Sequence, residues 1–258
     1  MSLLRTDSLR REFGGVIAVA DVDFSVEKGS ITGLIGPNGA GKTTLFNNIT
    51  GLDMPTEGCV FFKGEDITSL PAWKITRLGI ARTFQNIRLF SEMTVLENVM
   101  IGRHFQGIRS SFKRFKMLSA IFELIALKKE EKEIFESSMR WLEFFHLENE
   151  ADNLAKNLPY GKQRHLEIAR ALATEPELLF LDEPAAGMNA QETAELIETI
   201  RKIRAMGITV VLIEHDMKLV MSVCDRISVL NYGRKIAEGS PSEIQNNAEV
   251  IEAYLGKD

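Results

Sequence analysis

Residues 36–43 constrain the fold of this 258-residue chain more than any other segment. They read GPNGAGKT and fit the pattern G-x-x-x-x-G-K-[ST], which requires a loop between a strand and a helix. The strand-like run 30–35 precedes the loop, and residues 44–49 read as the first turns of a helix. Glycines let successive backbone N–H groups face one anion, and the N-terminus of the helix adds partial positive charge. The sequence therefore predicts a phosphate-binding loop.

Two side chains of this loop have the chemistry to handle a nucleoside triphosphate. Lys42 can reach the β- and γ-phosphates, and the Thr43 hydroxyl can ligate Mg²⁺. The candidate nucleotide-binding residues of the segment are Gly36, Asn38, Gly39, Ala40, Gly41, Lys42, Thr43 and Thr44.

A second informative segment spans residues 158–184 and reads LPYGKQRHLEIARALATEPELLFLDEP. Its apolar run 178–181 ends on Asp182 and Glu183, as expected for a parallel strand buried on both faces. Ligands of open α/β sheets bind at the carboxyl ends of strands, so both acids should reach the phosphate site. We expect Asp182 to hold Mg²⁺, directly or through water, and Glu183 to polarise the attacking water as a base.

Gln85 and His215 are further candidates for this site. His215 follows a strand-like run ending at Ile213 and Glu214, where a γ-phosphate could lie. Gln85 precedes the change to helical character and could contact Mg²⁺ or its water. Taken alone, His215 would be read as an ordinary surface or core residue and Gln85 as a solvated side chain.

Bulk properties exclude several classes of protein. A net charge of −5 and a pI near 5.6 argue against a general nucleic-acid binder. Cys59 and Cys224 are far apart and in no metal spacing, which favours a reducing compartment. The charged N-terminus does not resemble a signal peptide, and no apolar run approaches the roughly 18 residues of a membrane span. If the protein works at a membrane, we expect another chain to hold it there.

The organisation along the chain predicts one domain, residues 1–258, with an insertion. Residues 1–91 and 158–258 should form an α/β core that includes an N-terminal antiparallel β part, and residues 92–157 a helical subdomain. Within the core we predict a strand at 22–26, a helix at 190–206, a buried strand at 209–213 and a hairpin turn at 231–234. The insertion has apolar residues at helical spacing: Ile134, Phe135, Met139, Trp141, Leu142 and Phe145.

In this order the motifs resemble those of the ATP-binding subunits of ABC transporters. Residues 36–43 are similar to Walker A, Gln85 to the Q-loop, 158–164 to the signature, 178–183 to Walker B and His215 to the switch histidine. The resemblance implies an ABC-type P-loop NTPase that hydrolyses ATP with Mg²⁺. Gln85, Glu183 and His215 would be catalytic, and Thr43, Gln85 and Asp182 would hold the metal. It also implies that Phe13 stacks on adenine and that Gly161 contacts the nucleotide of a second subunit.

A narrower resemblance is to the LivG-type subunits of branched-chain amino-acid importers, and it rests on residues 158–164, 183–189, the long insertion and the ending 249–256. It implies a peripheral protein on the cytoplasmic face of the inner membrane, with two permease subunits and, indirectly, a periplasmic binding protein. The second ATPase subunit would be LivF-like or another copy of this chain. The alternatives are an ABC ATPase for amide, urea or lipid cargo, or a soluble ABC ATPase.

The chain departs from the usual signature in ways that affect the expected dimer. Pro159 stands where the family has Ser and offers neither a hydroxyl nor an N–H group. Tyr160 replaces a Gly, and Asn189 stands where an Asp is usual.

One further feature is the basic and aromatic segment 103–116, which reads as a solvated helix face or, less simply, as a contact with a permease or lipid.

Overall fold

The computed structural model describes residues 2–114 and 120–255, and the side chains of residues 105–114, 120–128 and 255 lie outside this description. The chain divides into two compact units, residues 1–85 with 177–258 and residues 86–176, and each is described by itself. We call them the nucleotide unit and the helical unit. The helical unit begins at residue 86, before the insertion predicted at 92–157. It also ends after that insertion, because it contains the helix that begins within the signature segment.

The strands all belong to the nucleotide unit, within the described residues. They are β1 (Ser2–Phe13), β2 (Val16–Val22), β3 (Ser25–Glu27), β4 (Ile31–Ile35), β5 (Glu57–Phe62), β6 (Glu65–Asp66), β7 (Ile80–Arg82), β8 (Leu178–Asp182), β9 (Thr209–Ile213), β10 (Arg226–Asn231) and β11 (Arg234–Gly239). Its helices are α1 (Lys42–Ile49), α2 (Ala72–Leu78), α6 (Ala190–Ala205), α7 (Met217–Val223), α8 (Pro241–Gln245) and α9 (Ala248–Leu255).

A six-stranded sheet in the order β11-β10-β4-β9-β8-β7 forms the core of the nucleotide unit. All neighbours are parallel except β10 and β11, which are joined by the predicted hairpin turn. Every residue of β4, β8 and β9 is buried, as expected for strands covered on both faces. The predicted α/β class, the strand at 209–213 and the helix starting at residue 190 are therefore confirmed.

The N-terminal strands form a second, antiparallel sheet in the order β2-β1-β5-β6, with β3 also paired to β1. The single strand predicted at 22–26 is wrong, because β2 ends at Val22 and β3 begins at Ser25. The buried Thr6 hydroxyl explains the break: it donates to Val22 O and accepts from Phe24 N–H, replacing ladder hydrogen bonds. The alternation of buried side chains nevertheless persists, since Val22, Phe24 and Val26 are all buried.

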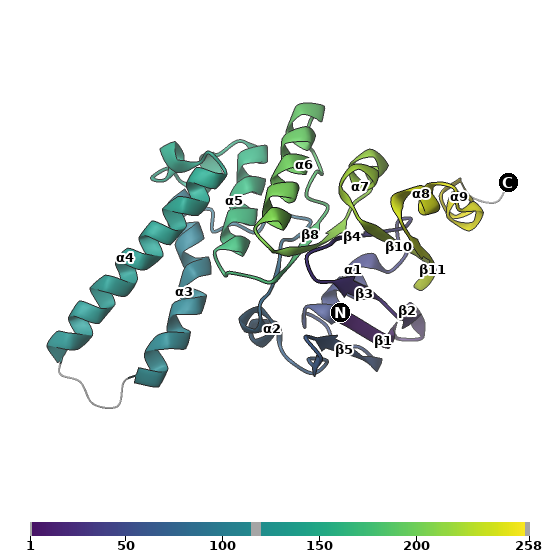
Figure 1. Cartoon of the computed structure of the whole chain (residues 1–258), viewed down its shortest axis with the longest axis horizontal. Helices are drawn as coiled ribbons and strands as arrows, with labels where there is room; N and C mark the ends of the chain where they lie inside the picture. The colour runs from purple at the N-terminus through teal and green to yellow at the C-terminus, as the bar shows by residue number, and fades with distance from the viewer. Residues whose placement is uncertain (1, 115–119, 256–258) are drawn as a thin grey trace. The chain divides into compact units, whose positions relative to one another are not determined.

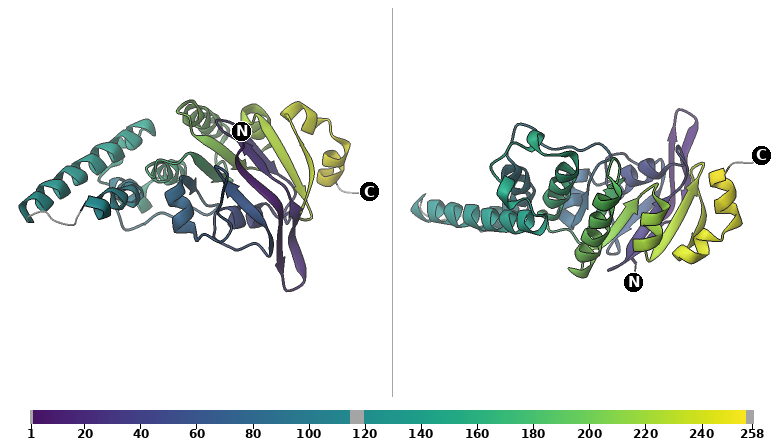
Figure 2. Two further views of the ribbon diagram at one scale, coloured as in Figure 1. Left: turned by 60° about the horizontal axis from the view of Figure 1, so that its bottom comes forward. Right: turned by 90° about the horizontal axis from the view of Figure 1, so that it is seen from above.

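Helix α1 lies between the two sheets of the nucleotide unit (Figure 1). Its Leu45, Phe46 and Ile49 join one hydrophobic core with residues of both sheets. The ring of Phe46 meets Phe180 of β8 edge-to-face, with ring centroids 4.7 Å apart. Helices α6 and α7 cover the other face of the six-stranded sheet, which the rotated views also show (Figure 2). This packing fixes the phosphate-binding loop, because α1 begins directly at its end.

The helical unit contains α3 (Val95–Arg114), α4 (Ala120–Phe144), two 3₁₀ turns, η1 (Glu148–Glu150) and η2 (Ala155–Asn157), and α5 (Tyr160–Leu172). Helices α3 and α4 run side by side (Figures 1 and 2). Ile134, Leu142 and Phe145 are buried as their spacing predicts, whereas Phe135 is exposed. Most of the basic and aromatic segment 103–116 lies outside the described side chains, so its role stays a prediction.

Within the described parts of the chain, no helix combines the length and the apolar character needed to cross a membrane.

The contact between Phe46 and Phe180 should contribute to the free energy of unfolding of the nucleotide unit. Phe180→Ala should lower the free energy of unfolding by about 3–5 kcal/mol, because it removes a fully buried ring and leaves a cavity. Urea unfolding followed in a Trp141→Phe background would measure this, since the chain has two tryptophans and Trp73 then reports on the nucleotide unit alone. The control Met54→Ala, at a 58% exposed position, should shift stability by no more than about 0.5 kcal/mol. Equal midpoints for the two variants would contradict this packing.

Candidate functional site

The phosphate-binding loop leaves β4 through Gly36 and enters α1 through Gly41. Both have positive φ, +152° and +98°, in a region that L side chains rarely adopt. A Cβ atom at Gly36 would lie 2.1 Å from Leu230 O, and one at Gly41 would lie 2.3 Å from Ala18 O. The loop therefore needs glycine at both positions, for backbone conformation and for close contact with β10 and β2.

Lys42 is the first residue of α1 and holds the loop closed. Its Nζ donates to Gly36 O at 2.7 Å and to Pro37 O at 3.0 Å. Burial lowers the pKa of the Lys42 ammonium below its usual value, and the charges of Glu183 and Asp182 oppose that shift. The Lys42 side chain thus lies in a partly dry site near Asp182, which ends β8, and Glu183, which follows it.

A cavity of about 300 Å³ opens over this loop. It brings together most residues that the sequence assigned to the nucleotide. The three predicted catalytic residues, Gln85, Glu183 and His215, also line it, although they come from segments far apart in the sequence. The lining residues are Ala18, Asn38, Gly39, Ala40, Gly41, Lys42, Thr43, Thr44, Gln85, Glu183 and His215. The lining is mainly polar and backbone-rich, which suits a phosphate chain rather than an apolar ligand.

Glu183 is held at the centre of the predicted catalytic group. Its φ of +48° is uncommon for a side chain other than glycine, and its N–H donates to Ile213 O at 2.9 Å. Gln85 Nε2 donates to Glu183 Oε2 at 2.8 Å, and His215 Nε2 lies 2.5 Å from Glu183 Oε1. The three side chains therefore meet through the two oxygens of one carboxylate.

Asp182 lies behind this group as the last residue of β8. It is 2% exposed and is not among the cavity-lining residues. Its Oδ2 accepts a hydrogen bond of 2.7 Å from Arg82 Nη2. The Thr43 hydroxyl, the Gln85 amide oxygen and the Asp182 carboxylate are the hard oxygen donors that Mg²⁺ prefers, so the residues present fit the expected metal.

Glu214 supports the site, and sequence reasoning missed it. Its Oε1 accepts from Ala185 N–H at 2.8 Å, and its Oε2 accepts from His215 N–H at 3.0 Å. Burial raises the pKa of this carboxyl, while these backbone hydrogen bonds oppose the shift. Glu214 thus joins the loop after β8 to the loop after β9. An acid directly after a fully apolar strand was the available signal.

Four predicted site residues lie outside the cavity lining: Gly36, Asp182, Phe13 and Gly161. Phe13 ends β1, is 47% exposed, and carries the Arg11 guanidinium 4.3 Å from its ring centroid. Gly161 is the second residue of α5 in the helical unit, and Pro159 occupies the N-cap position without a side-chain cap hydrogen bond. Adenine stacking by Phe13 and nucleotide contact by Gly161 stay predictions.

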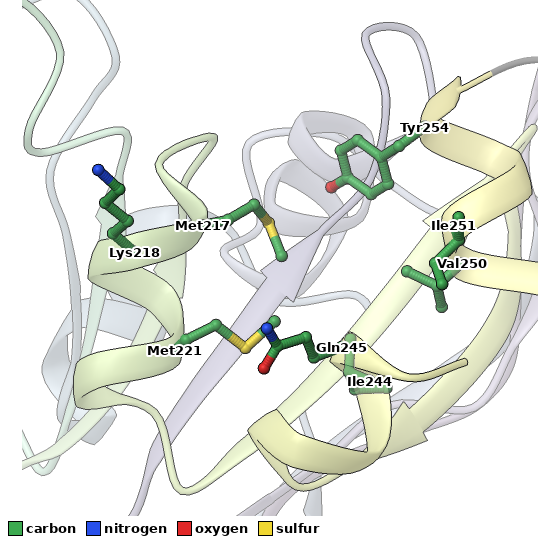
Figure 3. A pocket seen from close by; sticks show the side chains of 8 residues that line it. All are labelled: Met217, Lys218, Met221, Ile244, Gln245, Val250, Ile251 and Tyr254. Carbon is green, nitrogen blue, oxygen red and sulfur yellow. The ribbon is translucent and has the colours of Figure 1, made fainter. Parts of the chain in front are cut away.

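A second cavity, of about 500 Å³, lies between α7 and the C-terminal helices α8 and α9 (Figure 3). Methionine, isoleucine and valine side chains dominate its lining, so it does not suit a triphosphate. Tyr254 is one of its lining residues; burial raises the pKa of its phenol, and the nearby Gly36 N–H opposes that shift. The C-terminal helix α9 therefore contacts the start of the phosphate-binding loop, a link that the sequence did not predict.

Comparison with known proteins agrees with this geometry. The profile of the ABC transporter family matches residues 19–186, and one described as branched-chain amino acid ATP-binding cassette transporter matches residues 234–258. The chain is 46% identical over 256 residues to the high-affinity branched-chain amino acid transport ATP-binding protein BraF of Pseudomonas aeruginosa, covering 99% of this chain and 98% of that protein. It is 45% identical to LivG of Escherichia coli K12, with the same coverage.

A solved structure described as the ADP conformation of an ATP-binding cassette of an ABC transporter is similar over the whole chain. The TM-score is 0.84 with 35% sequence identity, and the match covers 100% of both chains.

The loop geometry predicts the effect of removing Lys42. Lys42→Ala should weaken binding of a fluorescent ATP analogue roughly ten- to hundredfold, because the phosphates lose a charged hydrogen-bond donor. The circular dichroism spectrum should stay native-like, since Lys42 contacts only the loop carbonyls through its ammonium. Lys28→Ala, at an exposed lysine paired with Glu177, is the matched control and should bind normally. Unchanged affinity in a native-like Lys42→Ala protein would refute the role of this loop.

Proposed function

This chain belongs to the ABC transporter family, and we propose that it is the ATP-hydrolysing subunit that powers import of branched-chain or other hydrophobic amino acids through membrane permease subunits. The observation that carries the proposal is the 46% identity to BraF over nearly the full length of both chains. The match includes the C-terminal residues 234–258, where the profile is specific to branched-chain amino acid cassettes.

The roles of the site residues follow from charge and position. In the proposal the phosphates of ATP lie over the N-terminus of α1, where the loop N–H groups and Lys42 neutralise their charge. Glu183 polarises the attacking water and takes its proton. Gln85 and His215 orient that water and the γ-phosphate through their contacts with Glu183. The left-handed backbone of Glu183 supports this, because strained conformations are kept where a side chain must be aimed.

The proposed metal residues are Thr43, Gln85 and Asp182. When bound, Mg²⁺ would neutralise negative charge on the β- and γ-phosphates. The protein supplies the oxygen donors from three separate segments, α1, the chain after β7, and β8.

The proposed assembly contains a second ATPase subunit, LivF-like, and two permease subunits, with a periplasmic binding protein acting through the permeases. The protein would lie peripherally on the cytoplasmic face of the inner membrane. The relatives' names support transport, and the permeases would supply the membrane spans that the described helices lack.

The N-terminus of α5 supports a heterodimer. The first main-chain hydrogen bond of this helix runs from Gln163 N–H to Pro159 O. The N–H groups of Tyr160, Gly161 and Lys162 therefore precede it, and Pro159 adds neither an N–H nor a hydroxyl. The partner's ATP would meet fewer donors than a serine-containing signature offers. We infer that the ATP bound by this chain is completed by a different subunit with a fuller signature.

Glu183→Gln tests the proposed base. The amide keeps the size of the side chain and some of its hydrogen bonds but removes the negative charge, so ATP binding should survive. ATP turnover by the assembled transporter should fall roughly 10²–10⁴-fold. Release of phosphate and filter-bound ATP would be measured on the same preparation, with Glu198→Gln, an exposed acid on α6, as the control. Near-normal turnover in the Glu183 variant would show that another group is the base.

A second experiment tests the asymmetry of the two ATP sites. The catalytic glutamate is replaced by glutamine in each ATPase subunit separately, and turnover of the two reconstituted transporters is compared. We expect Glu183→Gln in this chain to abolish most turnover and the equivalent change in the partner to cost less. Losing one hydrogen-bond donor to the charged γ-phosphate corresponds to about 1.5–3 kcal/mol, which is enough to give the two ATP sites measurably different turnover. Equal losses would contradict asymmetry, and full activity of this chain alone would contradict the heterodimer.

A further inference from the structure

Arg82 occupies a position that none of the motifs includes. It is the last residue of β7, which pairs in parallel with β8 so that Arg82 lies opposite Phe180. Three residues later comes Gln85, and two residues beyond Phe180 comes Asp182. The register thus places a guanidinium at the same edge of the sheet as the proposed metal and water ligands.

The guanidinium connects three segments of the nucleotide unit. Nη2 donates to Asp182 Oδ2 at 2.7 Å, and Nη1 donates to Asn47 Oδ1 at 2.8 Å and to Thr50 Oγ1 at 3.2 Å. Asn47 lies on α1 and Thr50 caps its C-terminus, so both move with the phosphate-binding loop. Arg82 therefore links the helix that starts at Lys42 to the strand that ends at Asp182.

Aromatic side chains and burial fix the guanidinium in this orientation. The Arg82 Cζ lies 5.5 Å from the ring centroid of Phe46 and 5.4 Å from that of Phe84. The side chains of Arg82 and Asp182 are 6% and 3% exposed. A buried ion pair keeps its geometry best when its charges make further hydrogen bonds, and for the Arg82 guanidinium the contacts with Asn47 and Thr50 provide them.

From these contacts, and resting on the proposed function, we propose that Arg82 is a positioning residue that orients the Asp182 carboxylate toward the divalent cation bound with ATP. Arg82 engages Oδ2 and fixes the rotamer of the side chain, so that Oδ1 is presented in one direction. The same guanidinium ties that direction to α1, which carries the Thr43 hydroxyl. Two of the three protein oxygens expected at the cation, those of Thr43 and Asp182, are thereby held at a fixed separation. Outer partners of metal ligands act in this way and typically change metal affinity 10–100-fold when removed.

The planar fork of arginine is essential to this role. Lysine would keep the positive charge beside Asp182 but has a single ammonium, which cannot span Asp182, Asn47 and Thr50 with fixed geometry. Arg82→Lys therefore separates orientation from charge compensation, and it avoids leaving a buried acid without a cation.

The test measures binding rather than turnover. A fluorescent ATP analogue is titrated into the purified full chain first with EDTA and then at graded Mg²⁺ concentrations. In Arg82→Lys we expect the metal-free affinity to stay within roughly twofold of the wild type, because the loop N–H groups and Lys42 are intact. The Mg²⁺ concentration for half-maximal enhancement should rise by roughly tenfold or more. The double variant Asn47→Ala/Thr50→Val keeps Arg82, and it should raise this Mg²⁺ concentration by a smaller factor.

Controls and contrary outcomes separate this inference from the function it rests on. Arg5→Lys, at an exposed arginine paired with Asp7, should leave both titrations unchanged. An unchanged Mg²⁺ requirement in Arg82→Lys would overturn the inference. An equal loss of affinity for the ATP analogue with and without Mg²⁺ would also overturn it, because it would show that Arg82 only supports the fold. If Arg82→Lys does not fold, the double variant decides by the same criterion. A wild-type chain that binds no ATP with or without Mg²⁺ would overturn the proposed function, and the inference with it.

Discussion

Parallel pairing of β7, β8, β9 and β4 brings the carboxyl ends of these strands to one edge of a buried sheet. The register places Asp182 opposite Ile213 and Leu34 opposite the same residue, so the loops after β4, β8 and β9 begin side by side. Each loop then carries one part of the proposed chemistry: the phosphate-binding loop after β4, Glu183 after β8 and His215 after β9. A slip of one residue in any pairing would turn these side chains to the other face. The site depends on this register more than on any single contact.

Local patterns predicted the parts of the protein whose structure is determined locally. The glycine pattern 36–43, the apolar runs ending at Asp182 and Ile213, and the turn before Arg234 all appear where the sequence indicated. A buried parallel strand reads as a continuous apolar run, and a phosphate loop needs glycine where φ is positive, so both leave direct traces in sequence. The strand predicted at 22–26 failed because one distant hydroxyl, that of Thr6, replaces its ladder hydrogen bonds.

The supporting contacts of the site could not be predicted in the same way. Arg82 meets Asp182 across 100 positions of sequence, and Tyr254 meets Gly36 from the opposite end of the chain. Neither residue has a distinctive pattern around it, because an arginine at a strand end or a tyrosine on an amphipathic helix is common. Only the tertiary arrangement gives them partners. Phe13 and Gly161 show the converse, since their expected roles need a nucleotide or a second subunit to act on.

The charged side chains around the phosphate-binding loop indicate which groups attract the phosphates of ATP. Arg82 is ion-paired with Asp182, and the charges of Glu183 and Asp182 oppose the lowering of the Lys42 pKa by burial. The positive charge of Arg82 is thus compensated by Asp182 before any phosphate arrives. Attraction for a triphosphate must therefore come from the backbone N–H groups of the loop and the N-terminus of α1 as well as from Lys42.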